Sequence, residues 1–260
     1  MDRSPPRRIV SLTCSNTEIV AALGCADRLV AVDDHSDYPD DVVATLPRVG
    51  PDLDIDVERV AALEPDLVLA SLTVPGHEAI IERLEAAGVP FVAPEPTRLA
   101  DIHRDIRDIG RRLGVEARAE SLVRSMQRDM VDSISPPSEG PSVVVQWWPK
   151  PTIAPGRLSW VTDMIHLAGG RNPIGHEEVK SRPIADEEVA ALAPDVIVVA
   201  WCGVHPSKYR PEVVRDNAAL RDTPAVRNGR VVCIPEAFLG RPGPRVVEGV
   251  RELRKVLHPA

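Results

Sequence analysis

A twelve-residue pattern occurs twice, once in each half of the chain, and this repeat most limits the possible folds. ERVAALEPDLVL begins at Glu58, and EEVAALAPDVIV begins at Glu187, 129 positions later in a chain of 260 residues. Each copy predicts a short helix, a Pro-Asp turn and an apolar run typical of a buried parallel strand. A weaker match relates TEIVAALG, from Thr17, to TDMIHLAG, from Thr162. The period is too long for a solenoid, so the repeat predicts two similar α/β lobes.

One uninterrupted amphipathic pattern lies between the two copies. EARAESLVRSMQRDMVDSI, residues 116–134, has apolar residues three and four apart and charged residues over much of the remaining surface. Pro136 and Pro137 then end the predicted helix. We therefore predict an α/β protein with two Rossmann-like lobes, each built on a parallel sheet, joined by one long backbone helix. The N-terminal lobe takes residues 1–113, the linking helix residues 114–135 and the C-terminal lobe residues 136–260.

Composition and missing motifs exclude several function classes. The formal net charge is −8 and no block is rich in Lys and Arg, which argues against nucleic-acid binding. The four cysteines match no zinc spacing and are interpreted as free thiols. No GxGxxG, P-loop, GxSxG or HExxH motif is present, so we predict a binding protein rather than an enzyme, with no cofactor and no resident metal. No apolar run could span a membrane and no signal-peptide pattern opens the chain, so a cytosolic location and a removed signal both remain open.

Aromatic and polar residues gather where predicted strands end. In a parallel sheet, ligands bind beyond the carboxyl ends of the strands. The candidates in such positions are Cys14, His35 and Tyr38 in the first half and Trp147, Trp148, Trp201, Phe238, Arg241 and Arg245 in the second. Aromatic residues make up only 3% of the chain, so their clustering is informative. If the two sheets point these ends at each other, the residues line a cleft suited to a large, flat, partly polar ligand. The alternative is that the aromatic side chains pack in separate lobe cores.

Several segments together resemble a known family. RIVSLTCSNTEIVAALG, DVERVAALEPDLVLA, ERLEAAGVPFV, WWPKPTIAPG, EEVAALAPDVIVV and RPGPRVVEGVREL are similar to segments of the substrate-binding proteins of ABC importers. The resemblance is to class III, with one long helix between two lobes, and to its cobalamin-binding branch. It implies a receptor that captures cobalamin or another corrinoid between the lobes and delivers it to a membrane permease. The corrinoid is then a transported ligand, the receptor is expected to be a monomer, and its site of work is periplasmic or otherwise extracytoplasmic.

The resemblance also implies roles for individual residues. Glu58 and Glu187 match the acidic positions that dock on the permease. His35, Trp147, Arg241 and Arg245 match ligand-contacting positions, while Asp52 lies near a position where related cobalamin binders have tryptophan.

Three alternative functions remain open. A haem or ferric-siderophore receptor of the same fold would use Arg157, Arg182, Arg241 and Arg245 as partners for an anionic ligand. A metal-ion receptor and a two-lobed enzyme are less favoured.

Overall fold

The computed structural model describes residues 4–130 and 140–259, which form two compact units. Unit 1 contains the described residues up to Pro96 together with Ala100–Ser125. Unit 2 contains Thr97–Leu99 and the described residues from Met126 onward. Helix α6 (Glu116–Met130) contributes residues to both units. The predicted end of this helix, at residues 131–134, and the predicted lobe boundary at residue 135 lie outside the described residues.

Unit 1 is built on a four-stranded parallel sheet in the order β2-β1-β3-β4. The strands are β1 (Ile9–Ser11), β2 (Leu29–Val32), β3 (Leu67–Leu69) and β4 (Phe91–Val92), and the helices between and after them are α1 (Cys14–Ala22), α2 (Asp40–Val43), α3 (Val57–Ala62), α4 (His77–Ala86) and α5 (Leu99–Arg112). The core packs Val10 and Val68 from the sheet against Val60 of α3 and Leu84 of α4, all fully buried. These β-branched strands are buried on both faces, as expected of a parallel sheet covered by helices.

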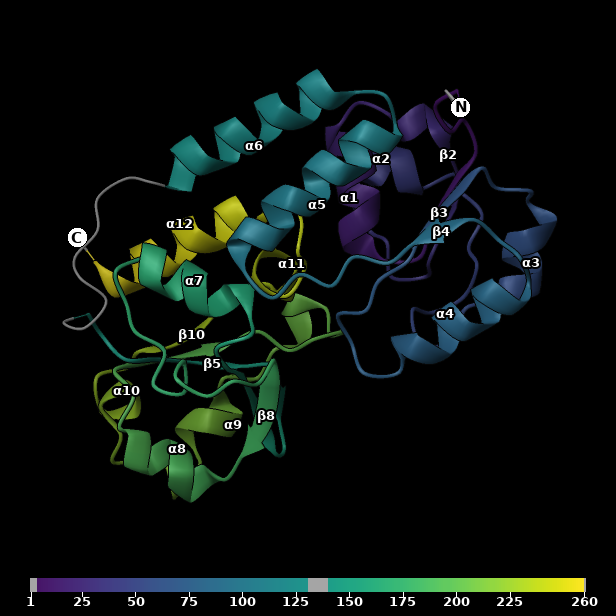
Figure 1. Cartoon of the computed structure of the whole chain (residues 1–260). Coiled ribbons are helices and arrows are strands. Elements are labelled where there is room, and N and C mark those ends of the chain that lie inside the picture. The colour runs from purple at the N-terminus through teal and green to yellow at the C-terminus, as the bar shows by residue number, and fades with distance from the viewer. Residues whose placement is uncertain (1–3, 131–139, 260) are drawn as a thin grey trace. The chain divides into compact units, whose positions relative to one another are not determined.

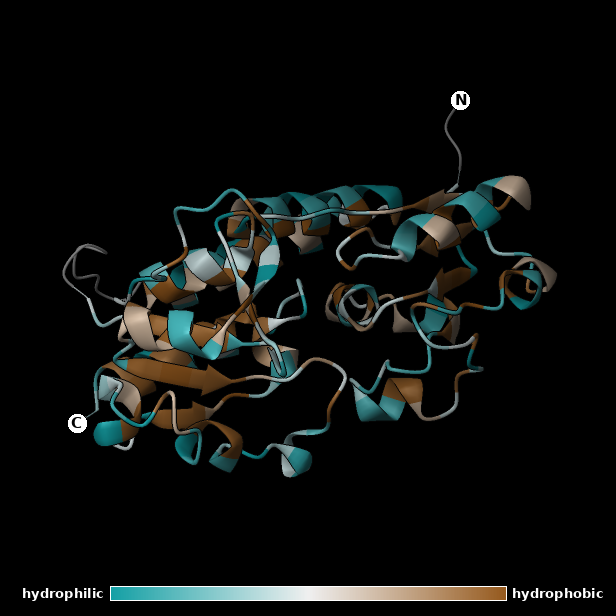
Figure 2. Ribbon diagram, turned by 90° about the horizontal axis from the view of Figure 1, so that it is seen from below, coloured by the Kyte–Doolittle hydropathy of each residue, from teal (hydrophilic) through white to brown (hydrophobic). Residues whose placement is uncertain are grey.

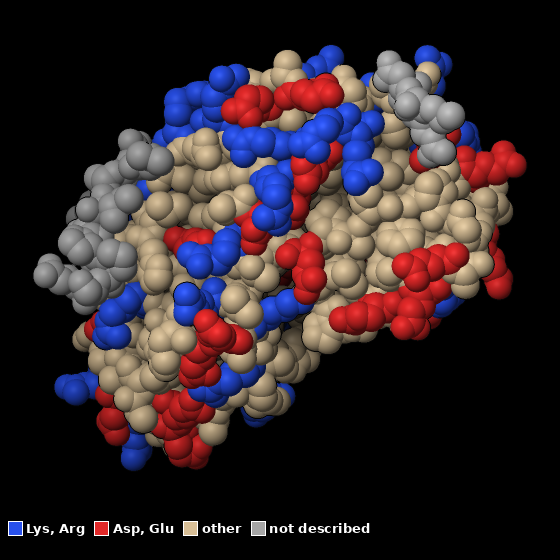
Figure 3. Space-filling model, in the orientation of Figure 1, with Lys and Arg blue, Asp and Glu red and all other residues tan. Residues whose placement is uncertain are grey.

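Helices α5 and α6 form a closely packed pair. A Cβ at Gly110 would lie 2.4 Å from the Cβ of Ala119, so the approach requires glycine at this position. Arg107 Nε donates to Glu120 Oε2 at 2.7 Å across the pair. Blue and red side chains alternate over this part of the surface (Figure 3). The predicted amphipathic pattern of α6 therefore has its apolar side, including Ala119 and Val123, buried and its charged side exposed.

Unit 2 contains a three-stranded parallel sheet in the order β10-β9-β5. Its strands are β5 (Val143–Gln146), β9 (Val196–Val199) and β10 (Val231–Cys233), and its helices are α7 (Trp160–Leu167), α8 (Asp186–Leu192), α9 (Glu212–Arg215), α10 (Pro224–Arg227), α11 (Glu236–Leu239) and α12 (Val246–Leu257). The sheet is coloured as hydrophobic in Figure 2, and α7 and α12 pack side by side in Figure 1. Two α/β units with parallel sheets, connected through α6, confirm the predicted fold class.

A second sheet in unit 2 was not predicted. Strands β6 (Trp148–Pro149), β7 (Thr152–Pro155) and β8 (Ser181–Ile184) pair antiparallel in that order. Trp148, expected where a strand ends, is therefore itself the first residue of a second strand. Proline is tolerated in such short edge strands because an edge leaves some backbone N–H groups unpaired in any case. The chain leaves the parallel sheet after Gln146 and enters another sheet directly.

The repeat has the same local structure in both units. Glu64 and Ala193, at equivalent places, both have a φ of 45° in the left-handed region before a proline. The aspartate that follows each proline accepts from the backbone of the segment preceding the neighbouring strand. Asp66 Oδ2 accepts from the N–H of Arg8 at 2.9 Å, and Asp195 Oδ2 accepts from the N–H of Ser142 at 2.7 Å. The Pro-Asp turn thus positions the next strand in the same way twice.

Candidate functional site

His35 lies beyond the carboxyl end of β2, in a loop held by its backbone. Its N–H donates to Asp33 Oδ2 at 3.0 Å, and its carbonyl accepts from Cys14 Sγ, the first residue of α1, at 3.0 Å. Burial raises the pKa of Asp33, although the hydrogen bond from Ser36 acts in the opposite direction. The loop is therefore fixed while the His35 ring is exposed. Tyr38, later in the same loop, is also exposed.

Asp52 lies between two imidazole rings at the same edge of the sheet. The segment that carries it runs alongside β2, because Val49 N donates to Val32 O and Asp34 N donates to Gly50 O. Asp52 Oδ1 is 3.8 Å from His35 Nε2, and Asp52 Oδ2 is 3.7 Å from His77 Nε2. The His77 imidazole, followed by the charge of His35, holds the pKa of Asp52 below its usual value, while burial opposes the change. The structure therefore brings together three predicted residues, Cys14, His35 and Asp52.

His77 is a member of this group that the sequence interpretation missed. It is the first residue of α4 and is only 3% exposed. Within the described part of the chain, neither ring nitrogen has a hydrogen-bond partner within reach. Its position at the start of a helix, shortly after a strand, was the signal available in the sequence. Across residues 4–130 and 140–259, no three His, Cys, Asp or Glu side chains are arranged to hold a metal ion.

In unit 2, two adjacent tryptophans follow the end of β5. Trp147 is half-buried, and its backbone pairs with both Ile153 and Cys202, since Trp147 N donates to Ile153 O and Cys202 N donates to Trp147 O. Trp148 is 44% exposed. A large indole left in solvent at the carboxyl edge of a sheet is available for contact with a ligand.

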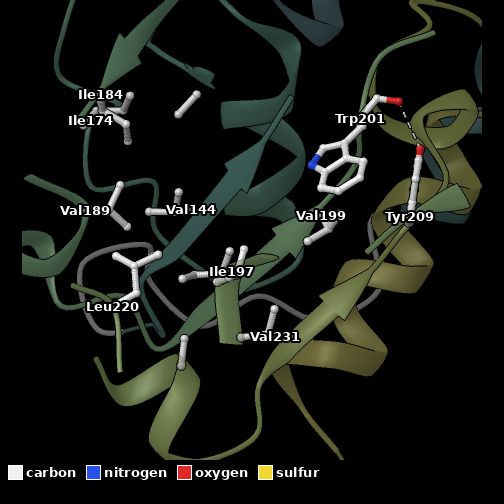
Figure 4. Packing of buried hydrophobic residues seen from close by; sticks show 13 residues of the cluster. Val144, Ile174, Ile184, Val189, Ile197, Val199, Trp201, Tyr209, Leu220 and Val231 are labelled. Atoms are coloured by element: carbon white, nitrogen blue, oxygen red, sulfur yellow. Dashed lines mark hydrogen bonds between the residues drawn. The ribbon is translucent and has the colours of Figure 1, made fainter. Parts of the chain in front are cut away.

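Trp201 is a core residue, which corrects the expectation that it lines a surface. It is 7% exposed and packs at 5.8 Å, between ring centroids, against Tyr209 (Figure 4). Its Nε1–H donates to Gln146 Oε1 at 3.0 Å, and its carbonyl accepts from the Tyr209 hydroxyl at 3.3 Å. Trp201 therefore follows the alternative expectation, that the aromatic side chains pack in a lobe core.

Phe238 and the two C-terminal arginines lie near one another in unit 2. Phe238, expected beyond the end of a strand, belongs to the short helix α11. The guanidinium carbon of Arg245, at the start of α12, lies 5.7 Å from the centre of its ring. Arg241 Nε lies 3.4 Å from Glu236 Oε2. These three residues therefore form one half-buried group of mixed charge and aromatic character.

The two glutamates expected to dock on a partner occupy equivalent places. Glu58 lies in the first turn of α3 and Glu187 in the first turn of α8, and both are exposed. The positive end of a helix dipole also favours a glutamate at this position. In the described parts of the chain, no helix combines the length and apolar character needed to cross a membrane.

Comparisons with known proteins agree over nearly the whole chain. A family model described as periplasmic binding protein matches residues 9–237. YvrC of Bacillus subtilis, an uncharacterised ABC transporter substrate-binding lipoprotein, is 31% identical over 99% of this chain and 82% of its own length.

Two solved structures are similar in fold but differ in the ligand named for them. The vitamin B12-binding protein BtuF of Vibrio cholerae is 26% identical, with a TM-score of 0.79, covering 98% of each chain. A periplasmic haem-binding protein of Pseudomonas aeruginosa is 30% identical, with a TM-score of 0.81, covering 98% of this chain and 94% of its own.

Proposed function

The chain belongs to the periplasmic binding protein family, as a substrate-binding protein for an ABC transporter, and we propose that its ligand is cobalamin or another corrinoid. The relatives named above are a substrate-binding lipoprotein of an ABC transporter, a vitamin B12-binding protein and a periplasmic haem-binding protein. We further propose that this chain works outside the cytoplasm and delivers its ligand to a permease. Glu58 and Glu187 would make the permease contacts.

The observation that carries the corrinoid proposal is the exposed Trp148 beside Trp147. A corrin ring is large and flat, and an indole face can cover it with little loss of side-chain freedom. Stacking of this kind suits a ligand whose central surface is apolar and whose rim is polar. His35, Tyr38 and Asp52 of unit 1 and Phe238 of unit 2 are the further contacts we propose.

Charge pairing favours a corrinoid over haem or a ferric siderophore. Haem carries two carboxylates, so its receptor needs cationic partners. Three of the four arginines considered for that role pair with carboxylates: Arg157 with Glu178 at 3.0 Å, Arg241 with Glu236, and Arg182 with both Glu177 and Glu188 at 2.5 Å. An anionic ligand would have to replace these carboxylates. The haem alternative is nevertheless supported by the similarity to the Pseudomonas aeruginosa protein, so it belongs in the same experiment.

Titration with cyanocobalamin, haemin and a ferric hydroxamate in parallel tests the proposal. All four tryptophans belong to unit 2, so their fluorescence reports binding there, and calorimetry gives the stoichiometry. We expect one-to-one binding of cyanocobalamin at submicromolar Kd, at about −8 kcal/mol or better. Trp148→Ala should weaken it by about tenfold or more, and Trp148→Phe, which keeps an aromatic face, should restore most of the loss.

The outcomes separate the alternatives. Tight binding of haemin with no binding of cyanocobalamin at tens of micromolar would replace the corrinoid with haem. If Trp148→Ala and the unmodified chain bind with equal affinity, Trp148 is not part of the site. The identity of the ligand then rests on the titrations of the unmodified chain.

A further inference from the structure

Among the described residues of unit 1, His77 is one of three buried side chains with an unpartnered polar atom, together with His103 and Asp105. Buried polar side chains are normally hydrogen-bonded, because an unmet donor or acceptor loses its water without compensation. His77 is 3% exposed, and among residues 4–130 and 140–259 it has no partner on Nδ1 or Nε2 within hydrogen-bond distance. The polar group that its Nε2 faces is the Asp52 carboxylate, 3.7 Å away.

The Asp52 carboxylate lies next to the buried His77 ring and is also partly exposed to solvent. Its side chain is 32% exposed, with His77 on Oδ2 and the ring of His35 on Oδ1 at 3.8 Å. Both separations exceed hydrogen-bond length, so the carboxylate oxygens keep acceptor capacity for a third group. His77 is also the main cause that lowers the pKa of Asp52, which favours the ionised carboxylate.

We propose that Asp52 and His35 form a recognition site for a primary amide of the ligand, and that His77 positions Asp52. The amide NH₂ donates to Asp52 Oδ1, and the amide oxygen accepts from a ring N–H of His35. A primary amide is the group that offers two donors and an acceptor together. This inference rests on the corrinoid proposal, because corrinoids carry primary amides around the ring.

The same site rejects a carboxylate at that position of the ligand. Asp52 is accompanied by Asp33, whose Oδ2 holds the His35 backbone, and by Asp34, whose Oδ1 accepts from Gly50 N at 3.3 Å. A ligand carboxylate would therefore meet like charges and lose the donor that Asp52 requires. This edge of unit 1 should therefore favour a ligand with an amide at that position over one with a carboxylic acid there.

The test compares cyanocobalamin with a derivative in which one peripheral amide is hydrolysed to the acid. We expect the unmodified chain to bind cyanocobalamin on the order of tenfold more tightly than at least one such monocarboxylate. Asp52→Asn should reduce that ratio to about twofold or less, because the substituted amide can donate to the ligand carboxylate. Asp27→Asn is the matched control. It makes the same charge change on an exposed residue of η1 (Ala26–Arg28), which precedes β2, and should keep the full ratio.

His77 variants test the positioning role. His77→Gln retains an N–H near the same place and should keep most of the discrimination, whereas His77→Ala should lose it. Both are compared at equal occupancy of the folded state, measured by thermal unfolding. The Asp52→Asn result does not depend on the His77 variants, because asparagine has nearly the same shape as aspartate and the Asp52 side chain is only 32% exposed.

Two results would overturn the inference, and they are distinguishable. If cyanocobalamin binds and Asp52→Asn keeps the full ratio, the amide site is wrong while the corrinoid proposal stands. If the unmodified chain does not bind cyanocobalamin, the corrinoid proposal fails and this inference fails with it.

Discussion

Replacement of Trp201 by phenylalanine separates a packing role from a ligand-binding role. The indole is buried in unit 2, and its Nε1–H donates to Gln146 Oε1 at 3.0 Å. Gln146 is itself buried, and its Nε2 donates to Thr152 Oγ1 at 2.9 Å. Trp201→Phe therefore removes the donor to a buried acceptor.

The expected cost follows from two contributions. An unmet buried acceptor costs about 1–3 kcal/mol. Trp→Ala in a core costs about 3–5 kcal/mol, and because phenylalanine refills most of the space, the remaining void costs roughly 1 kcal/mol. Together these predict a loss of about 2–4 kcal/mol in the free energy of unfolding of unit 2.

Urea denaturation followed by tryptophan emission measures this loss directly, because every tryptophan belongs to unit 2. With a slope of about 2 kcal/mol per molar urea, the midpoint should fall by roughly 1–2 M. Trp148→Phe, at an exposed side chain, should move it by less than about 0.3 M. The reasoning is refuted if Trp201→Phe leaves the midpoint in place but weakens cyanocobalamin binding as strongly as Trp148→Ala does.

Two further predictions concern buried and structural carboxylates. Burial raises the pKa of Asp105 in α5 to about 6, so the folded chain loses stability as pH rises from about 4 to 6 and gains none back above that range. Asp105→Asn should therefore stabilise unit 1 by about 1 kcal/mol at pH 8 and by almost nothing at pH 4. Urea denaturation followed by circular dichroism measures this difference. An equal effect at both pH values would contradict the desolvation argument. Asp195→Asn should weaken the hydrogen bond from Ser142 N and lower the urea midpoint detected by tryptophan emission by about 0.5 M. Asp66→Asn makes the equivalent change in unit 1 and should leave that midpoint unchanged. A shift of the tryptophan signal by Asp66→Asn would show that the two units do not unfold separately.

The features that could be predicted from sequence are those set by local periodicity. The helix-turn-strand elements of the repeat, α3 to β3 and α8 to β9, and the amphipathic helix α6 were expected, because apolar spacing and breakers specify them without reference to the rest of the chain. The antiparallel strands at Trp148–Pro149 and Ser181–Ile184 were missed. A two-residue strand such as Trp148–Pro149 has no periodicity, and Ser181–Ile184 pairs with Thr152–Pro155, a partner far along the sequence.

The candidate site was likewise predictable from the sequence only in part. Sequence alone determined the two-unit α/β fold, since the repeat at Glu58 and Glu187 encodes one helix-turn-strand element twice. It also placed Cys14, His35 and the two adjacent tryptophans at strand ends. Only the tertiary structure decided that Trp201 is buried and that the His77 ring lies next to the Asp52 carboxylate. The reason is physical: a side chain's burial and partners depend on which distant elements pack around it, and a residue's place relative to its own strand does not contain that information.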